Sequence, residues 1–198
     1  MKPSTGAWWQ SEAGYLPKSI YILAVAAICL SLLKPIPSVA GSGSETSGDV
    51  VMAVVPVAAL ALAYFKDDVE GEKQWLRNVL ANQFLTSVAR VGIDQTSFGA
   101  RPNGHRYAFP SGHVAFAGSG ASFLSERYGW RYGVPAWLMT AYVANNRVQS
   151  DHHHWRDVIV SGALAYGVGK LFVTPEKATY LAPVIGPQFV GLRWERSW

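Results

Sequence analysis

Four almost uninterrupted apolar runs dominate this sequence. They cover residues 19–33, 50–65, 133–144 and 158–173. Each is shorter than the ~20 residues that comfortably span a bilayer. Only 15% of the chain is charged and 49% is apolar, which excludes a disordered chain. The same figures fit either a polar membrane protein or a very apolar soluble protein.

Two weaker helical patterns lie between these runs. Residues 75–93 have helical spacing of apolar side chains, and residues 111–124 consist mainly of small residues that allow helices to pack closely. We therefore predict an all-α fold, a bundle of about six helices that is membrane-embedded. We expect a short irregular C-terminal tail, in which only Phe189–Trp194 has a strand-like pattern.

The sequence divides into three parts. Residues 1–49 form an N-terminal anchor and linker, residues 50–173 a helical domain, and residues 174–198 the tail. The first part has two interpretations, because Pro37–Ala40 before Gly41 resembles a signal-peptide cleavage site as well as the end of a retained helix. We interpret residues 41–49 as a flexible polar linker.

The distribution of basic residues gives an orientation. With a cytoplasmic N-terminus, most Lys and Arg residues fall on the cytoplasmic side of six spans, as the positive-inside rule requires. This orientation puts the loops 94–110 and 147–155 on the same outer side. We therefore expect a multi-pass protein of a bacterial-type inner membrane, with these two loops facing the periplasm or exterior.

Those two loops contain the residues that suggest chemistry. Pro110 before Ser111 and Gly112 marks a helix start, whose free N–H groups favour an anion. Arg101 and Arg147 supply guanidinium groups suited to phosphate oxygens.

Two histidines accompany these anion-binding groups. His153 and Asp157 are four residues apart and share a helix face, so the carboxylate can orient the imidazole. His113 remains as a second histidine that can act as an acid. Together the two loops predict an oxyanion cradle, a nucleophilic histidine with its carboxylate, and a proton donor.

In these motifs the sequence resembles the type 2 phosphatidic acid phosphatase / vanadium haloperoxidase superfamily. The family motifs are K-x(6)-R-P, P-S-G-H and S-R-x(5)-H-x(3)-D. Arg101-Pro102 matches the end of the first, residues 110–113 match the second in full, and Arg147, His153 and Asp157 match the third.

The resemblance implies a phosphatase that uses no metal and no other cofactor. His153 would form a phosphohistidine, Asp157 would orient it, and His113 would protonate the leaving oxygen. The phosphate-binding groups would be Arg101, Arg147, Ser111 and the Gly112 N–H. A phosphorylated lipid in the membrane is the expected substrate, and the oligomeric state stays open.

The chain departs from the family pattern at two positions. The motif lysine is replaced by Asp94, and Arg90 lies one helical turn earlier, where we expect it to reach the same phosphate. Asn146 replaces the serine before Arg147.

Several alternatives remain open from the sequence. They are an exported acid phosphatase acting on small phosphate esters, a vanadium-dependent haloperoxidase, and a catalytically weak lipid-binding protein. The three consecutive histidines 152–154 also suggest a metal cluster, although only His153 has the motif spacing. A single cysteine, Cys29, excludes a disulfide framework, and scattered rather than clustered basic residues argue against nucleic-acid binding.

Overall fold

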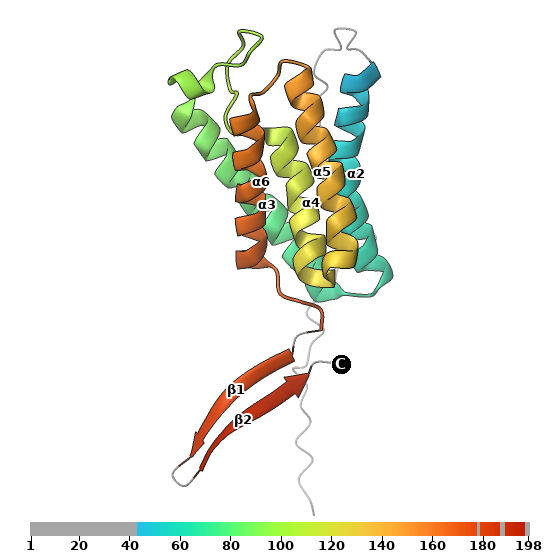
Figure 1. Cartoon of the computed structure of the whole chain (residues 1–198). Helices are drawn as coiled ribbons and strands as arrows, with labels where there is room; N and C mark the ends of the chain where they lie inside the picture. The colour runs from blue at the N-terminus through green and yellow to red at the C-terminus, as the bar shows by residue number, and fades with distance from the viewer. Residues whose placement is uncertain (1–42, 178, 187–188, 197–198) are drawn as a thin grey trace, which may run out of the picture. The chain divides into compact units, whose positions relative to one another are not determined.

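The computed structural model describes residues 43–177, 179–186 and 189–196. The predicted helix at 19–33 lies outside these residues. The described elements, labelled as in Figure 1, are α2 (Gly43–Phe65), α3 (Val69–Ile93), the 3-10 helix η1 (Ser97–Gly99), α4 (Gly112–Tyr128), α5 (Trp130–Gln149), α6 (Trp155–Phe172), β1 (Thr179–Gly186) and β2 (Phe189–Arg196).

The five α-helices correspond one to one with five of the six predicted helices, and the helical fold class is confirmed. Two parts of the chain differ in kind from the prediction. Residues 43–49, interpreted as a linker, form the first turns of α2. The tail, predicted to be irregular, contains an antiparallel hairpin in which β2 includes the strand-like stretch Phe189–Trp194.

Helix α4 is the centre of the bundle and packs against α2, α3, α5 and α6. Its small residues allow this close packing, as the sequence predicted, and every residue from Val114 to Leu124 is buried. At Gly120 an added Cβ would lie 2.6 Å from the Pro56 backbone in α2. Any larger residue there would force α2 and α4 apart.

Helix α3 turns a polar face inward and an apolar face outward. Its buried face carries Gln74, Asn78, Asn82 and Thr86, spaced four residues apart. Asn78 Nδ2 donates to the Ser119 carbonyl of α4 at 2.8 Å, and Asn82 Nδ2 donates to the Ala115 carbonyl. These bonds satisfy polar groups that would be costly to bury alone.

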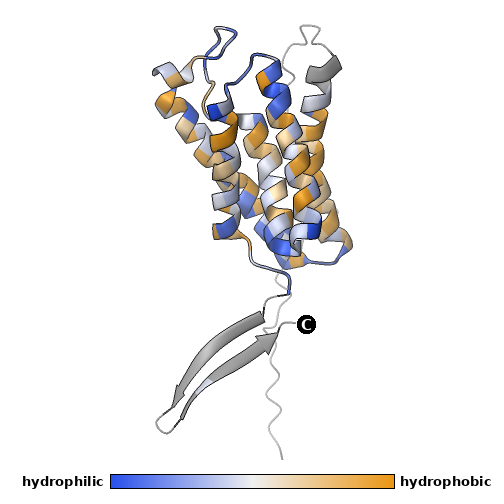
Figure 2. Ribbon diagram, viewed as in Figure 1, coloured by the Kyte–Doolittle hydropathy of each residue, from blue (hydrophilic) through white to orange (hydrophobic). Residues whose placement is uncertain are grey.

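Large apolar side chains are exposed around the bundle. On α3 they are Leu80, Phe84, Val88 and Val91, and further examples occur on α2, α5 and α6. Figure 2 shows hydrophobic residues along the helices and hydrophilic residues gathered towards the loops at the two ends. One described helix, over Ser47–Phe65, is long and apolar enough to cross a membrane. An apolar exterior over a polar inner helix face is what a lipid environment would favour.

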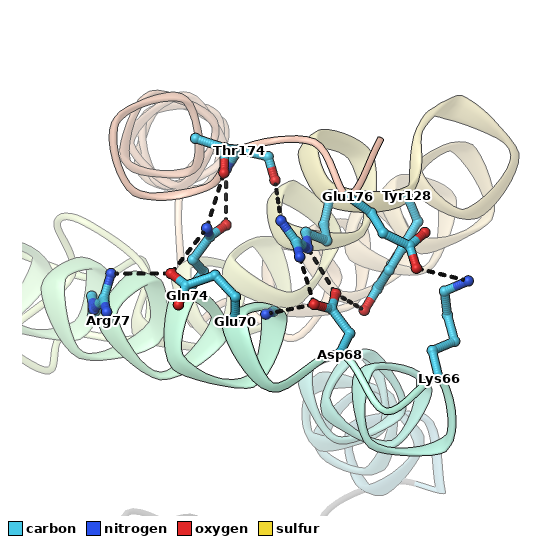
Figure 3. A network of polar contacts seen from close by, with 10 residues as sticks. Lys66, Asp68, Glu70, Gln74, Arg77, Tyr128, Thr174 and Glu176 are labelled. Carbon is cyan, nitrogen blue, oxygen red and sulfur yellow. Dashed lines mark hydrogen bonds and ion pairs between the residues drawn. The ribbon is translucent and has the colours of Figure 1, made fainter. Parts of the chain in front are cut away.

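An ion-pair network closes the end of the bundle where α2 meets α3 (Figure 3). Asp68 accepts hydrogen bonds from Arg127 Nε at 2.7 Å and Tyr128 Oη at 2.8 Å, and caps α3 through the Gly71 N–H. Burial opposes ionisation of Asp68, but the bonds from Arg127, Gly71 and Tyr128 outweigh it and hold the pKa of this carboxyl below its usual range. The same arginine donates to the Thr174 carbonyl, which fixes the chain where it leaves α6.

Candidate active site

The two loops that carry the motif residues lie side by side at the opposite end of the bundle from the Asp68 network. One joins α3 to α4 and the other joins α5 to α6. The Asn103 N–H donates to the Asp151 carbonyl at 3.2 Å, and the Ser111 N–H donates to the Asp157 carbonyl at 3.3 Å. These backbone bonds join segments that are about fifty residues apart in the chain. The predicted site residues of the two loops are therefore held at one end of the bundle.

His153 is buried, and its ring orientation is fixed by a backbone carbonyl. Its Nδ1 lies 2.7 Å from the Ala108 oxygen. Because a carbonyl only accepts, Nδ1 carries the proton and Nε2 keeps its lone pair. Burial first, and then the positive charge of Arg101, lower the pKa of His153 to about 3. The imidazole is therefore neutral at physiological pH, the state a nucleophile requires.

Asp157 is also fully buried, but its strongest contact is with the start of α6. Its Oδ2 accepts the His154 N–H at 2.8 Å and lies 3.7 Å from His153 Nδ1. The carboxylate is thus placed to support positive charge on the imidazole. The hydrogen bond that orients the ring comes from Ala108, which sequence reasoning missed because a backbone carbonyl has no sequence signal.

Arginines converge on the same place from different elements. The side chain of Arg101 is half-buried, and its Nε makes no hydrogen bond within the described residues. Burial, followed by the charges of Arg90 and Arg147, lowers the pKa of Arg101. Like charges gathered this closely need an anion to compensate them.

Arg90, which we expected to replace the motif lysine, lies near the start of α4. Its guanidinium donates to the Tyr107 carbonyl at 3.1 Å, and its Nη1 would lie 3.1 Å from a Cβ added at Gly112. Arg90 therefore lies against the first turn of α4. Its buried Nε has no hydrogen-bond partner in the described part of the chain.

Asp94, at the sequence position of the motif lysine, has a structural role. It is buried at the end of α3, and its Oδ1 accepts the Tyr107 N–H at 2.8 Å. The same oxygen lies 3.6 Å from Arg106 Nε. Asp94 thus fixes the loop whose next residue, Ala108, orients His153.

The start of α4 supplies the remaining anion-binding groups. Ser111 is its N-cap and is fully buried, yet its Oγ has no hydrogen-bond partner among the described residues. Gly112 opens the helix, so its N–H belongs to the first turn, where donors have no partner within the helix. A buried hydroxyl and free amides at a helix N-terminus form a site suited to an anion.

His113 and Arg147 lie next to a residue that the sequence analysis did not single out. Arg147 is buried and donates through Nη2 to Asn146 Oδ1 at 2.9 Å. Asp49 of α2 places Oδ1 2.9 Å from the same Nη2 and 3.3 Å from His113 Nε2. In the sequence, Asp49 is marked only by its position, as a carboxylate directly before the apolar run at 50–65 on the predicted outer side.

The three consecutive histidines point to different partners. His152 Nδ1 contacts the Ser150 carbonyl at 2.8 Å, His153 contacts Ala108, and His154 Nδ1 lies 3.5 Å from Asp157 Oδ2. No group of three or more His, Cys, Asp or Glu in the described segments is placed to hold a metal ion. Within the described segments, the three histidine rings thus contact three different partners.

In the motif residues at the end of its helical bundle, the chain is similar to the PAP2 superfamily. The model of that family matches residues 84–178, which include both loops. The superfamily resemblance drawn from the three motifs is confirmed.

The chain is also similar to individual proteins. The chain is 34% identical over 107 residues to a lipid A 4'-phosphatase from Helicobacter pylori, a match that covers 52% of this chain and 51% of the relative. The chain thus spans about half the length of this curated relative. The fold resembles that of LpxE from Aquifex aeolicus, with a TM-score of 0.50 at 17% identity over 75% of this chain and 92% of that one. A transmembrane PAP2 type phosphatidylglycerolphosphate phosphatase from Bacillus subtilis has a TM-score of 0.46 at 16% identity, over 78% and 92%.

Proposed function

We propose that this protein is a phosphatase that removes phosphate from a phosphomonoester or diphosphate of a lipid, through a phosphohistidine at His153. One observation supports this above all. A buried, neutral imidazole lies beside Arg101, Arg90 and Ser111, whose buried polar atoms have no partner within the described residues. An oxyanion that accepted from these donors would place its phosphorus near the imidazole.

The reaction proceeds in two displacements. In the first, His153 Nε2 forms a bond to phosphorus while the bond from phosphorus to the lipid oxygen breaks, and His113 gives its proton to that oxygen. In the second, water attacks the phosphorus and returns a proton to His113, and the phosphorus–nitrogen bond breaks to release inorganic phosphate. Arg101, Arg147, Arg90, Ser111 and the Gly112 N–H stabilise the charge on the phosphoryl oxygens.

A lipid substrate is supported by the surroundings of the site. The apolar side chains exposed around the bundle, including Leu80, Phe84 and Val88, suit a hydrocarbon environment. The site lies at one end of the helices, where a bilayer would present lipid head groups. The curated relative is named a lipid A 4'-phosphatase, so a phosphorylated sugar head group is the first substrate to test. We place the protein in a bacterial-type inner membrane as a multi-pass protein, with this end facing the periplasm or exterior.

Phosphate release from a lipid panel tests the proposal. The full chain in detergent would be assayed with short-chain phosphatidic acid, phosphatidylglycerophosphate, a polyprenyl diphosphate and a lipid A phosphate. His153→Ala serves as the blank, and His105→Ala, which changes an exposed loop histidine, serves as the matched control. We expect release that survives EDTA, falls with vanadate and disappears only in His153→Ala.

Other outcomes would contradict the proposal. Turnover limited to small soluble esters would favour the exported acid phosphatase. Bromide oxidation with peroxide and vanadate would favour the haloperoxidase. Loss with EDTA and recovery with zinc would favour a metal site, and no release from any ester would favour a lipid-binding protein.

A further inference from the structure

We propose that Asp49 is a positioning residue for the general acid His113, and that it also fixes Arg147 beside the leaving group. This inference rests on the proposed phosphatase function. It starts from one carboxylate oxygen, Asp49 Oδ1, which lies 3.3 Å from His113 Nε2 and 2.9 Å from Arg147 Nη2. No family motif includes this position, which lies more than fifty residues before the first motif residue in the chain.

The packing of α2 against α5 places Asp49 at the site. At the preceding residue, Gly48, an added Cβ would lie 2.1 Å from Asn146 Oδ1 and 3.1 Å from Arg147 Nη2. A larger residue here would have to displace the Asn146 side chain, so the glycine allows the first turns of α2 to lie directly against the end of α5. The Ser47 hydroxyl lies 2.6 Å from Tyr142 Oη and forms a second contact between the two helices. The location of Asp49 is therefore built into the helix packing.

The charges around each group show that His113 lies near both the carboxylate and the nucleophile. Those acting most strongly on Asp49 belong to His113, Arg147 and His152. Those acting most strongly on His153 belong to Arg101, His113 and Arg90. His113 is common to both sets, so it lies near the Asp49 carboxylate as well as near the nucleophile His153. The leaving oxygen of an in-line displacement lies opposite the nucleophile, and His113, the proposed proton donor, is the residue that Asp49 contacts.

This arrangement suits proton donation. Burial lowers the pKa of His113, and the hydrogen bond and charge of Asp49 act against this shift. The carboxylate thus supports the protonated ring that a general acid needs, and it fixes the orientation of that ring. At 3.3 Å the Asp49–His113 contact is looser than a short charge-assisted bond, so the proton stays available to a leaving oxygen that enters beside it. Once His113 has given up the proton, Asp49 still balances the charge of Arg147.

Substrates that differ only in their leaving group test this role. Asp49→Asn would be compared with the wild type on p-nitrophenyl phosphate, whose leaving group needs little protonation, and on an alkyl phosphomonoester, whose leaving group needs a full proton. We expect kcat on the alkyl ester to fall roughly 10–100-fold, within the usual range for general-acid catalysis. On p-nitrophenyl phosphate we expect a change of less than about threefold, with KM unchanged for both substrates.

Three further variants sharpen the test. Asp49→Glu should restore part of the lost rate. In a His113→Ala background, Asp49→Asn should lower kcat only slightly further, because the two residues act as a unit. Glu70→Gln removes a carboxylate of similar exposure at the other end of the bundle, 51% against 47% for Asp49, and should leave both rates unchanged.

Two results would overturn the assignment. An equal loss of kcat on both substrates would mean that Asp49 only stabilises the fold or positions Arg147. A lower KM with unchanged kcat would mean that the carboxylate competes with the phosphate for its site. Failure of the phosphatase proposal itself looks different, because the wild type and His153→Ala would then release equally little phosphate.

Discussion

His153 donates its Nδ1 proton to the Ala108 carbonyl at 2.7 Å, while the Asp157 carboxylate lies 3.7 Å from the same nitrogen. A main-chain group thus selects the tautomer, and the acidic side chain contributes charge and caps α6. This division of roles separates this histidine–aspartate pair from one in which the carboxylate alone orients the ring.

The first prediction concerns Asp157→Asn. The Ala108 bond preserves the tautomer, so we expect kcat to fall about 10–100-fold, much less than in His153→Ala. Asp157→Ala should also destabilise the fold by about 1 kcal/mol, because the His154 N–H at the start of α6 loses its acceptor. Phosphate release and thermal unfolding in detergent measure the two effects. A loss in Asp157→Asn equal to that of His153→Ala would show that the carboxylate sets the tautomer during turnover.

The second prediction concerns Arg90 as the replacement for the motif lysine. Arg90→Gln removes a donor at the start of α4, and we expect kcat to fall about 10²–10³-fold. Adding Asp94→Lys should not rescue the rate, because Asp94 holds the Tyr107 N–H and its loss would loosen the loop before Ala108. Arg77→Gln, on the same helix at the far end, is the control and should keep full activity. Rescue by Asp94→Lys would refute the assignment of Arg90.

The third prediction follows from the lowered pKa of His153. The folded value is about 3 against an ordinary 6.5, so between these pH values the unfolded chain binds the additional proton. Stability should therefore fall as the pH is lowered through this window, with His153 contributing up to about 1.4 kcal/mol per pH unit. Thermal unfolding of the wild type and His153→Gln at several pH values between 7 and 4.5 measures this slope. Identical slopes would show that His153 is not held neutral by its surroundings.

The fourth prediction separates stability from activity. Arg127→Ala leaves the Asp68 carboxylate buried without its main partner, and we expect a loss of about 3–5 kcal/mol. The turnover of the folded protein should stay within about twofold, because the active site lies at the other end of α4, roughly 25 Å away at 1.5 Å per residue. Asp68→Asn combined with Arg127→Ala should recover part of the stability. A large drop in kcat for the folded protein would instead indicate coupling between the two ends.

Local patterns in the sequence predicted a large part of this molecule. Apolar continuity and helical spacing predicted the five described α-helices, since these properties depend on neighbours three or four residues apart. Fixed spacing also led to the prediction that His153, Asp157 and Arg147 belong to one site. Helical geometry also predicted that Arg90 extends towards the phosphate-binding groups. In the structure its guanidinium lies next to Gly112 at the start of α4.

Tertiary structure decided the features that depend on distant contacts. The role of Ala108 belongs to a carbonyl that every residue type possesses, so no side chain marks it. Asp49 seemed part of a linker because its partners, His113 and Arg147, lie 64 and 98 residues further along the chain. The polar residues of α3 gave no indication that they face inward, because their hydrogen-bond acceptors lie on α4, which is distant in the sequence. The sequence by itself therefore determined the helices and the family of the site, whereas the packing of α2 and the loops around α4 decided which groups orient the reacting histidines.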